Sequence, residues 1–145
     1  MIKAVIIGFA HMHVNEIALY IHEQPDIELI GCADVPPEAP EKTRARYTRA
    51  WNLKNVSETY HVKVYEDYIS MLDQLKPDIA FILTENFRKP EIVEECAKRG
   101  INVSIEKPIA VSLAEAKKIK ASVERYGIEA VVNWPTTWRD YIYRM

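Results

Sequence analysis

A charged pair and a proline, Glu106-Lys107-Pro108, directly follow an apolar run that is otherwise typical of a buried strand. An ammonium group at the carboxyl end of a strand can polarise a carbonyl oxygen or stabilise an alkoxide. A strand that ends on Glu106-Lys107 is therefore typical of the rim of a binding site. The alternative is a solvated ion pair, which contributes little to stability.

A second candidate site follows the first apolar run of the chain. Gly8 can open a tight turn into a helix whose free N–H groups would bind a pyrophosphate. A dinucleotide-binding turn has the pattern Gly-x-Gly-x-x-Gly, and here Ala10 and His13 occupy the second and third glycine positions. Taken alone, this turn is weak evidence for a dinucleotide, because only Gly8 matches the pattern.

Asp34 ends the next apolar run, near the position at which an acid accepts hydrogen bonds from an adenosine ribose. A carboxylate there would repel a 2′-phosphate, and Val35-Pro36-Pro37 follows with no adjacent arginine. The pattern therefore favours NAD over NADP as the cofactor. The alternative role for Asp34 is that of a helix N-cap or turn residue.

His11 and His13, together with Glu16, are residue types that bind metals. Positions i and i+2 of a turn point in different directions, and no second cluster completes a tetrahedron, so the sequence predicts no metal site. Nucleophilic catalysis has no support, because no Ser-His-Asp or Cys-His motif occurs. Cys32 and Cys96 lie in apolar or helical stretches, which predicts free thiols in a reducing cytoplasm.

The elements that must position these residues follow from the alternation of apolar runs with amphipathic stretches, which is typical of βα units. The predicted strands are 2–7, 27–33, 61–65, 79–84, 102–105 and 129–134. The predicted helices are 14–23, 38–50, 67–75, 89–99 and 112–126. We therefore predict a Rossmann-like α/β fold, a doubly wound, mostly parallel sheet with helices on both faces. Ligands of such sheets bind at the carboxyl ends of the strands.

The overall composition narrows the function further. The chain has 145 residues, of which 48% are hydrophobic and 28% charged, enough for one domain with a substantial core. A formal net charge of −2 leaves no basic face for nucleic acid. No signal peptide or membrane-length apolar run is apparent, so we expect a cytoplasmic protein without a membrane partner.

Together these motifs resemble the N-terminal half of the glucose-fructose oxidoreductase, inositol dehydrogenase and rhizopine-catabolism family, usually written Gfo/Idh/MocA. The sequences of its members resemble the pattern D-x-V-x-x-x-T-P-x-x-x-H, which is followed by a helix that ends in Gly and then by V-x-x-E-K-P. This chain has DIAFILTENFRK and ECAKRGINVSIEKP, which places Thr84 and Gly100 in register with Glu106. Glu85 replaces the proline of the pattern, and Lys89 replaces the histidine.

The resemblance implies an NAD(P)-dependent dehydrogenase that transfers hydride between the cofactor, with NAD preferred, and a sugar, polyol or related secondary alcohol. In the family, the lysine of Glu-Lys-Pro contacts the nicotinamide ribose and the reacting hydroxyl, and here this is Lys107. The resemblance also suggests a cis Lys107–Pro108 bond. The residues that it places at the cofactor are Gly8, Phe9, Ala10, His11, Met12, Asp34, Thr84, Glu85, Asn86, Glu106 and Lys107.

The resemblance further implies that residues 1–145 are the cofactor domain alone and end at the start of a linker helix, TWRDYIYRM. The C-terminal domain for substrate binding and oligomerisation would be absent, so we expect a homo-oligomeric parent enzyme and an inactive isolated chain. Two other classes remain open. One is a non-catalytic module that senses NAD(H). The other is an S-adenosylmethionine-binding Rossmann unit, which would explain Gly8 and Asp34 but not Lys107.

Overall fold

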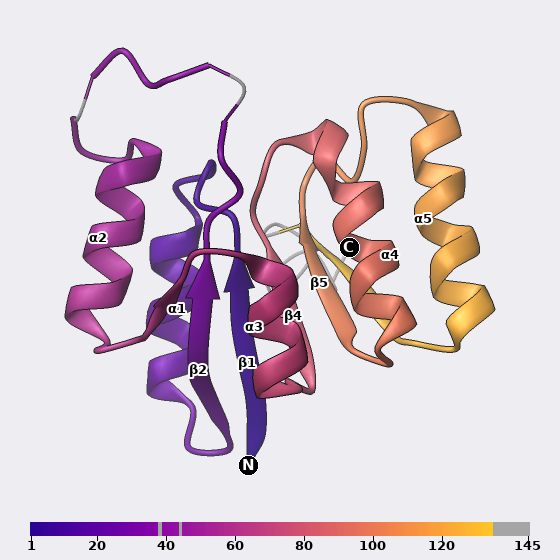
Figure 1. The fold of residues 1–145 in the computed structure, drawn as a ribbon, viewed down its shortest axis with the longest axis horizontal. Helices are drawn as coiled ribbons and strands as arrows, with labels where there is room; N and C mark the ends of the chain where they lie inside the picture. The colour runs from indigo at the N-terminus through magenta and orange to yellow at the C-terminus, as the bar shows by residue number, and fades with distance from the viewer. Residues whose placement is uncertain (38, 44, 135–145) are drawn as a thin grey trace, which may run out of the picture.

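The computed structural model describes residues 1–37, 39–43 and 45–134. Six parallel strands form one sheet in the order β3-β2-β1-β4-β5-β6 (Figure 1). The strands are β1 Ile2–Ile7, β2 Ile27–Ala33, β3 Val64–Tyr65, β4 Ile79–Ile82, β5 Asn102–Glu106 and β6 Ala130–Asn133. The helices are α1 Val14–Glu23, α2 Arg49–Thr59, α3 Tyr68–Leu75, α4 Lys89–Lys98 and α5 Leu113–Tyr126, with a short 3-10 helix η1 at Asn86–Arg88. The predicted Rossmann-like fold is confirmed.

Helices cover both faces of the sheet because successive strand residues point to opposite sides. In β1, Ala4 and Ile6 belong to the hydrophobic cluster that also contains residues of α1 and α2. Val5 and Ile7 belong to the cluster on the other face, with residues of α3, α4 and α5. Each fully buried valine or isoleucine side chain contributes about 1.5–3 kcal/mol to stability. These two clusters fix the sheet between its helical layers and hold the strand ends in place.

Capping residues set several helix ends where the sequence predicts them. The side chain of Asp67 accepts a hydrogen bond of 2.7 Å from the Ser70 N–H at the start of α3. Ser112 accepts one of 3.2 Å from the Glu115 N–H at the start of α5. Gly127 ends α5 in the left-handed conformation, with φ +66°. These local signals account for the agreement between predicted and observed bounds.

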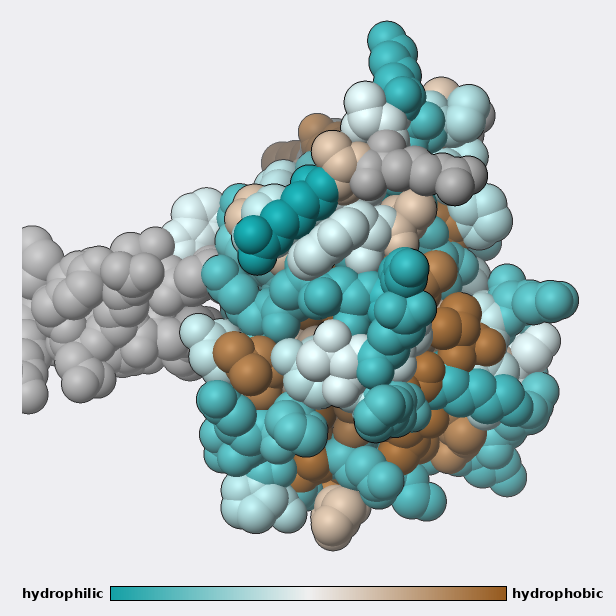
Figure 2. Space-filling view, turned by 90° about the vertical axis from the view of Figure 1, so that its left-hand side faces the viewer, coloured by the Kyte–Doolittle hydropathy of each residue, from teal (hydrophilic) through white to brown (hydrophobic). Residues whose placement is uncertain are grey.

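The predicted helix over 38–50 is wrong. The described residues between β2 and α2 form turns and irregular structure, and α2 instead runs from Arg49 to Thr59 after an extended Thr48. Pro40 keeps Ala39 out of the helical region, and Tyr47 has φ +70°, which a helix does not allow. The Glu41 side chain instead accepts hydrogen bonds from the N–H groups of Arg49 and Ala50 at the start of α2. Figure 2 views the molecule from the side on which α2 lies in Figure 1. The surface there is mostly hydrophilic, with hydrophobic side chains in small separate patches.

The remaining differences are small. The predicted third strand is reduced to Val64–Tyr65, and the fourth ends at Ile82 rather than Thr84. The helix expected in TWRDYIYRM lies outside the described residues. None of the helices in the described part of the chain is both long and apolar enough to cross a membrane.

Candidate functional site at the carboxyl ends of the strands

The predicted site residues lie together at the carboxyl ends of the neighbouring strands β2, β1, β4 and β5 (Figure 1). Gly8 follows β1, Asp34 follows β2, Thr84 lies just beyond β4, and Glu106 ends β5. The strand order reverses between β1 and β4, so this is the topological switch point at which open α/β sheets bind their ligands.

The turn after β1 requires glycine at its first position. Gly8 has φ +86°, and a Cβ atom there would lie 2.6 Å from Cβ of Thr84 and 2.7 Å from its main-chain nitrogen. Glycine therefore allows the ends of β1 and β4 to approach each other. Within the same turn, Phe9 is buried in the core, whereas Ala10 and Met12 are exposed. Ala10, Met12 and the half-buried His11 can therefore present side chains to a ligand from this turn.

The end of β2 carries an ion-pair network that the sequence did not reveal. Arg49, which is 7% exposed, forms short ion pairs with both Asp34 and Glu85. It also donates a hydrogen bond of 2.8 Å to the Val35 carbonyl oxygen. Asp34 in addition accepts a hydrogen bond of 3.1 Å from the Phe9 N–H. Asp34 caps no helix, since α2 begins only at Arg49. Its ion-pair partner Arg49 lies outside the segment Val35-Pro36-Pro37 that follows it in sequence.

Burial and the shared arginine act in opposite directions on these two acids. Burial raises the pKa of Asp34 above its usual value, and Arg49 offsets only part of this effect. Burial also raises the pKa of Glu85, but hydrogen bonds from Arg49 and Thr84 outweigh it, so its pKa lies below the usual value. One cation thus serves two carboxylates, and this corner keeps a net negative charge when both are ionised.

Lys89 holds the segment that carries Lys107. Its side chain is 1% exposed and donates hydrogen bonds to the carbonyl oxygens of Glu106 and Pro108 and to Oδ1 of Asn86, the last two at 2.7 and 2.8 Å. Burial lowers the pKa of Lys89 to about 8, although Glu106 acts in the opposite direction. The Lys107–Pro108 bond is cis, as the resemblance suggests. In the sequence, Lys89 stood out only as a departure from the family's histidine.

Lys107 itself is half-buried. Among residues 1–37, 39–43 and 45–134, none forms an ion pair with its ammonium group. Glu106 is 1% exposed, so the two neighbours are not a solvated surface pair. Their side chains occupy different environments: Glu106 is buried, whereas Lys107 is half-buried and has no carboxylate at ion-pair distance within those ranges.

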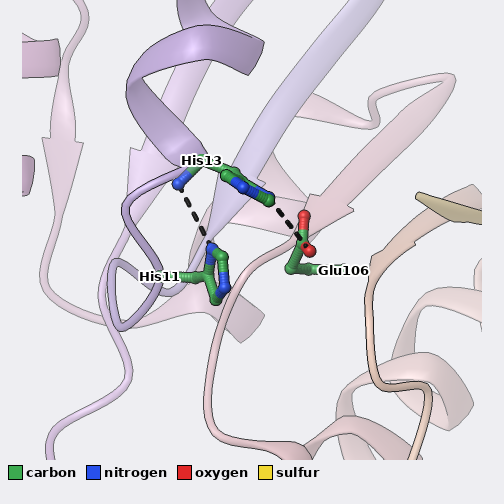
Figure 3. Close-up of side chains that lie close together, drawn as sticks. All are labelled: His11, His13 and Glu106. Carbon is green, nitrogen blue, oxygen red and sulfur yellow. Dashed lines mark hydrogen bonds and ion pairs between the residues drawn. The ribbon is translucent and has the colours of Figure 1, made fainter. Parts of the chain in front are cut away.

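Glu106 instead meets two histidines from the turn after β1 (Figure 3). Its Oε2 accepts a hydrogen bond of 2.8 Å from Nδ2 of Asn133, and its Oε1 lies 3.2 Å from Nδ1 of His13. The His13 N–H donates to Nδ1 of His11 at 3.2 Å, and the two rings have centroids 4.3 Å apart. Burial lowers the pKa of His11 below its usual value, with Glu106 opposing this. Glu16, which the sequence suggested as the third member, is exposed.

The comparison with protein families settles the class of this domain. Residues 2–133 match the family model for Gfo/Idh/MocA, described as an oxidoreductase family with an NAD-binding Rossmann fold. The chain belongs to this family. The match covers every strand and helix of the described structure, so the Gfo/Idh/MocA assignment extends over the whole candidate site.

Individual relatives agree with the family match. Over 80 residues, which are 55% of this chain and 21% of the relative, the chain is 30% identical to D-apiose dehydrogenase from Paraburkholderia graminis. An oxidoreductase from Agrobacterium radiobacter, solved in complex with NAD+, L-tartaric acid and magnesium, has a similar fold, with a TM-score of 0.80 at 21% identity. Myo-inositol 2-dehydrogenase from Lactobacillus plantarum gives 0.74 at 19%. Each structural match covers 99% of this chain but only 38% and 39% of the respective relative.

Proposed function

We propose that this domain binds NAD, in preference to NADP, for an oxidoreductase that transfers hydride between the cofactor and a sugar, a polyol or a related secondary alcohol. The observation that carries the proposal is the position of Asp34 and Lys107 on opposite sides of the Gly8 turn, at the switch point of the sheet. A dinucleotide that crosses this point has its adenosine near β2 and its nicotinamide near β5.

Each site residue has a role in this proposal. The turn from Gly8 to Met12 and the first N–H groups of α1 would hold the pyrophosphate. Asp34 would accept hydrogen bonds from the adenosine ribose. The segment Thr84, Glu85 and Asn86 would line the middle of the cofactor, and Lys107 would polarise the reacting oxygen beside the nicotinamide.

The substrate class rests on the relatives. One acts on apiose and another on myo-inositol, by their names, which supports a sugar or polyol for the parent enzyme. This chain spans less than two fifths of the solved relatives' length, so we propose that it supplies the cofactor half of a larger, cytoplasmic, homo-oligomeric enzyme.

Calorimetric titration of the domain with NAD, NADP and S-adenosylmethionine tests the proposal. We expect NAD to bind more tightly than NADP, because the Asp34 carboxylate repels a 2′-phosphate, and we expect no binding of S-adenosylmethionine. In Asp34→Ala, NAD should bind about tenfold more weakly, the effect of losing ~1.4 kcal/mol of hydrogen bonding. NADP should bind unchanged or more tightly, because Arg49 then loses one of its two acidic partners.

Asp26→Ala is the matched control, since Asp26 is exposed and lies just before β2, at the opposite end of that strand. It should change neither affinity. Equal losses of NAD and NADP binding in Asp34→Ala would show that Asp34 only supports the structure. Absence of NAD binding to the unmodified domain would overturn the proposal, and binding of S-adenosylmethionine would favour the methyl-donor class.

A further inference from the structure

We propose that His11, His13 and Glu106 form a binding site for one divalent transition-metal ion, such as Zn²⁺ (Figure 3). One nitrogen of each histidine and one carboxylate oxygen all lie within 4.8 Å of one another. The histidines come from the turn after β1, and the carboxylate comes from the end of β5, so the sheet itself brings the three together. Two imidazoles and one carboxylate are a ligand set of catalytic zinc sites.

Unsatisfied polar atoms are the second observation that indicates a ligand here. Nδ1 of His13 and Oε1 of Glu106 are both buried, and neither has a hydrogen-bond partner among the described residues. The whole Glu106 residue is 1% exposed, so water cannot readily solvate this oxygen. A buried carboxylate oxygen without a partner destabilises the fold, and more strongly when it is charged. A bound cation would remove this destabilisation.

The distance between these two atoms also fits a shared ion. Zinc binds nitrogen and oxygen ligands at ~2.0–2.2 Å in tetrahedral geometry, which places neighbouring ligand atoms roughly 3.3 Å apart. Nδ1 of His13 and Oε1 of Glu106 are 3.2 Å apart without the geometry of a hydrogen bond. The two atoms therefore already have the spacing of two ligands to one ion.

The third ligand is a ring nitrogen of His11, and Nε2 would be available without any change. Nδ1 of His11 now accepts the His13 N–H at 3.2 Å, at the long end of the usual range. Coordination through this nitrogen would replace that hydrogen bond. The released N–H lies at the start of α1, where it could bind an anion such as the proposed pyrophosphate.

The surroundings of Glu106 resemble the outer shell of a metal site. Asn133 donates to its Oε2 at 2.8 Å, and Lys89 donates to its main-chain carbonyl oxygen, so the carboxylate is held in one orientation. Imidazole ligands favour zinc, cobalt, nickel or iron over magnesium and calcium, which prefer sites made only of oxygen atoms. The structure therefore points to a transition metal.

The location suggests what the ion would do, and this part rests on the proposed function. Glu106 ends β5 and directly precedes Lys107, so an ion here would lie at the same carboxyl end of the sheet as the proposed reacting oxygen. A divalent cation with open coordination positions acts as a Lewis acid on such an oxygen. Metal binding by the three side chains does not depend on this role and can be tested without cofactor or substrate.

The test uses the domain after treatment with a chelator and its removal, in the absence of NAD. We expect one equivalent of Zn²⁺ to bind in calorimetry and to raise the melting temperature, and one equivalent of Co²⁺ to give visible absorption bands of a low-symmetry site. His11→Ala, His13→Ala and Glu106→Gln should each weaken Zn²⁺ binding by about 100-fold or more, since loss of even an outer-shell partner costs ~10–100-fold.

His22→Ala is the matched control, because His22 is exposed in the last turn of α1, away from the turn that bears His11 and His13. It should leave Zn²⁺ affinity unchanged. Circular dichroism checks the fold of each variant, and the two half-buried histidines keep the test valid if Glu106→Gln does not fold. Failure of the unmodified domain to bind one equivalent, or unchanged affinity in the folded histidine variants, would overturn the metal site. Titration of the metal-free domain with NAD decides the proposed function separately.

Discussion

Buried charged groups are paired differently in two regions at the carboxyl ends of the strands. At the ends of β2 and β4, Asp34 and Glu85 share the guanidinium of Arg49, so two acids and one cation are directly paired. At the ends of β1 and β5, Glu106 faces His13 with one unpartnered oxygen, and the nearby Lys89 donates to main-chain carbonyl oxygens and an amide instead.

The difference indicates which region is assembled for structure and which for chemistry. In the first region one cation pairs with both acids, so its removal would leave two partly buried carboxylates without a partner and should destabilise the fold. In the second region polar atoms remain unsatisfied within the described residues, and the half-buried Lys107 has no carboxylate partner there. Buried polar atoms without a hydrogen-bond partner are rare in folded proteins and often mark a ligand or a catalytic role. We therefore expect the first region to shape the proposed cofactor site and the second to present the proposed reactive groups.

Arg49→Met should give the largest loss of stability. The substitution keeps an unbranched side chain but leaves Asp34 and Glu85 without their cation. Breaking a fully buried pair costs ~3–5 kcal/mol, and because these acids are 20% and 29% exposed, we expect a loss of about 2–3 kcal/mol in the free energy of unfolding. Urea denaturation at pH 7 measures it.

Arg46→Met is the control for this experiment, since Arg46 is exposed and its cation lies over the rings of Tyr47 and Trp51 rather than between acids. It should change the free energy of unfolding by less than about 1 kcal/mol. Equal effects of the two substitutions would contradict the view that the first region is a structural charge cluster.

Lys89→Met tests the second region through pH. The pKa of Lys89 is about 8 in the folded protein, compared with 10.5 for the unperturbed group. Between these values the unfolded chain binds more protons than the folded chain, so the contribution of Lys89 makes unfolding less favourable as pH rises. Wild type should therefore gain roughly 2–3 kcal/mol relative to Lys89→Met between pH 8 and 10.5.

Denaturation curves of both proteins across this range give the difference directly, and ionising thiols and tyrosines common to both proteins cancel. Lys98→Met is the control, because Lys98 lies in the same helix at its exposed last turn and pairs with Glu94 and Glu95. A stability difference between wild type and Lys89→Met that does not change with pH would show that Lys89 is not a cation held by burial.

Lys107→Ala should have the smallest effect on stability, within about 0.5 kcal/mol, because the side chain is half-buried and makes no ion pair in the described ranges. In the intact enzyme, turnover should fall by about 100-fold or more if the ammonium stabilises charge on the substrate oxygen. NAD affinity should fall far less. Thermal melting combined with steady-state kinetics makes the measurement, and near-normal turnover would show that Lys107 is not a catalytic residue.

Much of the fold was predictable because its signals are local. The run 2–7 and the capping residues Asp67 and Ser112 specify strand and helix ends through their immediate neighbours in sequence. Because the ends of the strands 2–7 and 27–33 were predicted correctly, the sequence also placed Gly8 and Asp34 at the carboxyl ends of these two strands. The charged composition of 38–50 favours a helix, but the positive φ of Tyr47 and the hydrogen bonds from the start of α2 to Glu41 decide otherwise, and neither is visible in the sequence.

The sequence by itself determined the parallel α/β sheet, the family and the presence of Lys107 at a strand end, because periodicity and motif spacing are properties of neighbouring residues. Only the tertiary structure decided the partners of the buried charges. Arg49, at the start of α2, contacts Asp34 after β2 and Glu85 after β4. Glu106, at the end of β5, contacts His13 in the turn after β1. Such pairings depend on which strands become neighbours, and burial in the folded core is what makes them matter energetically.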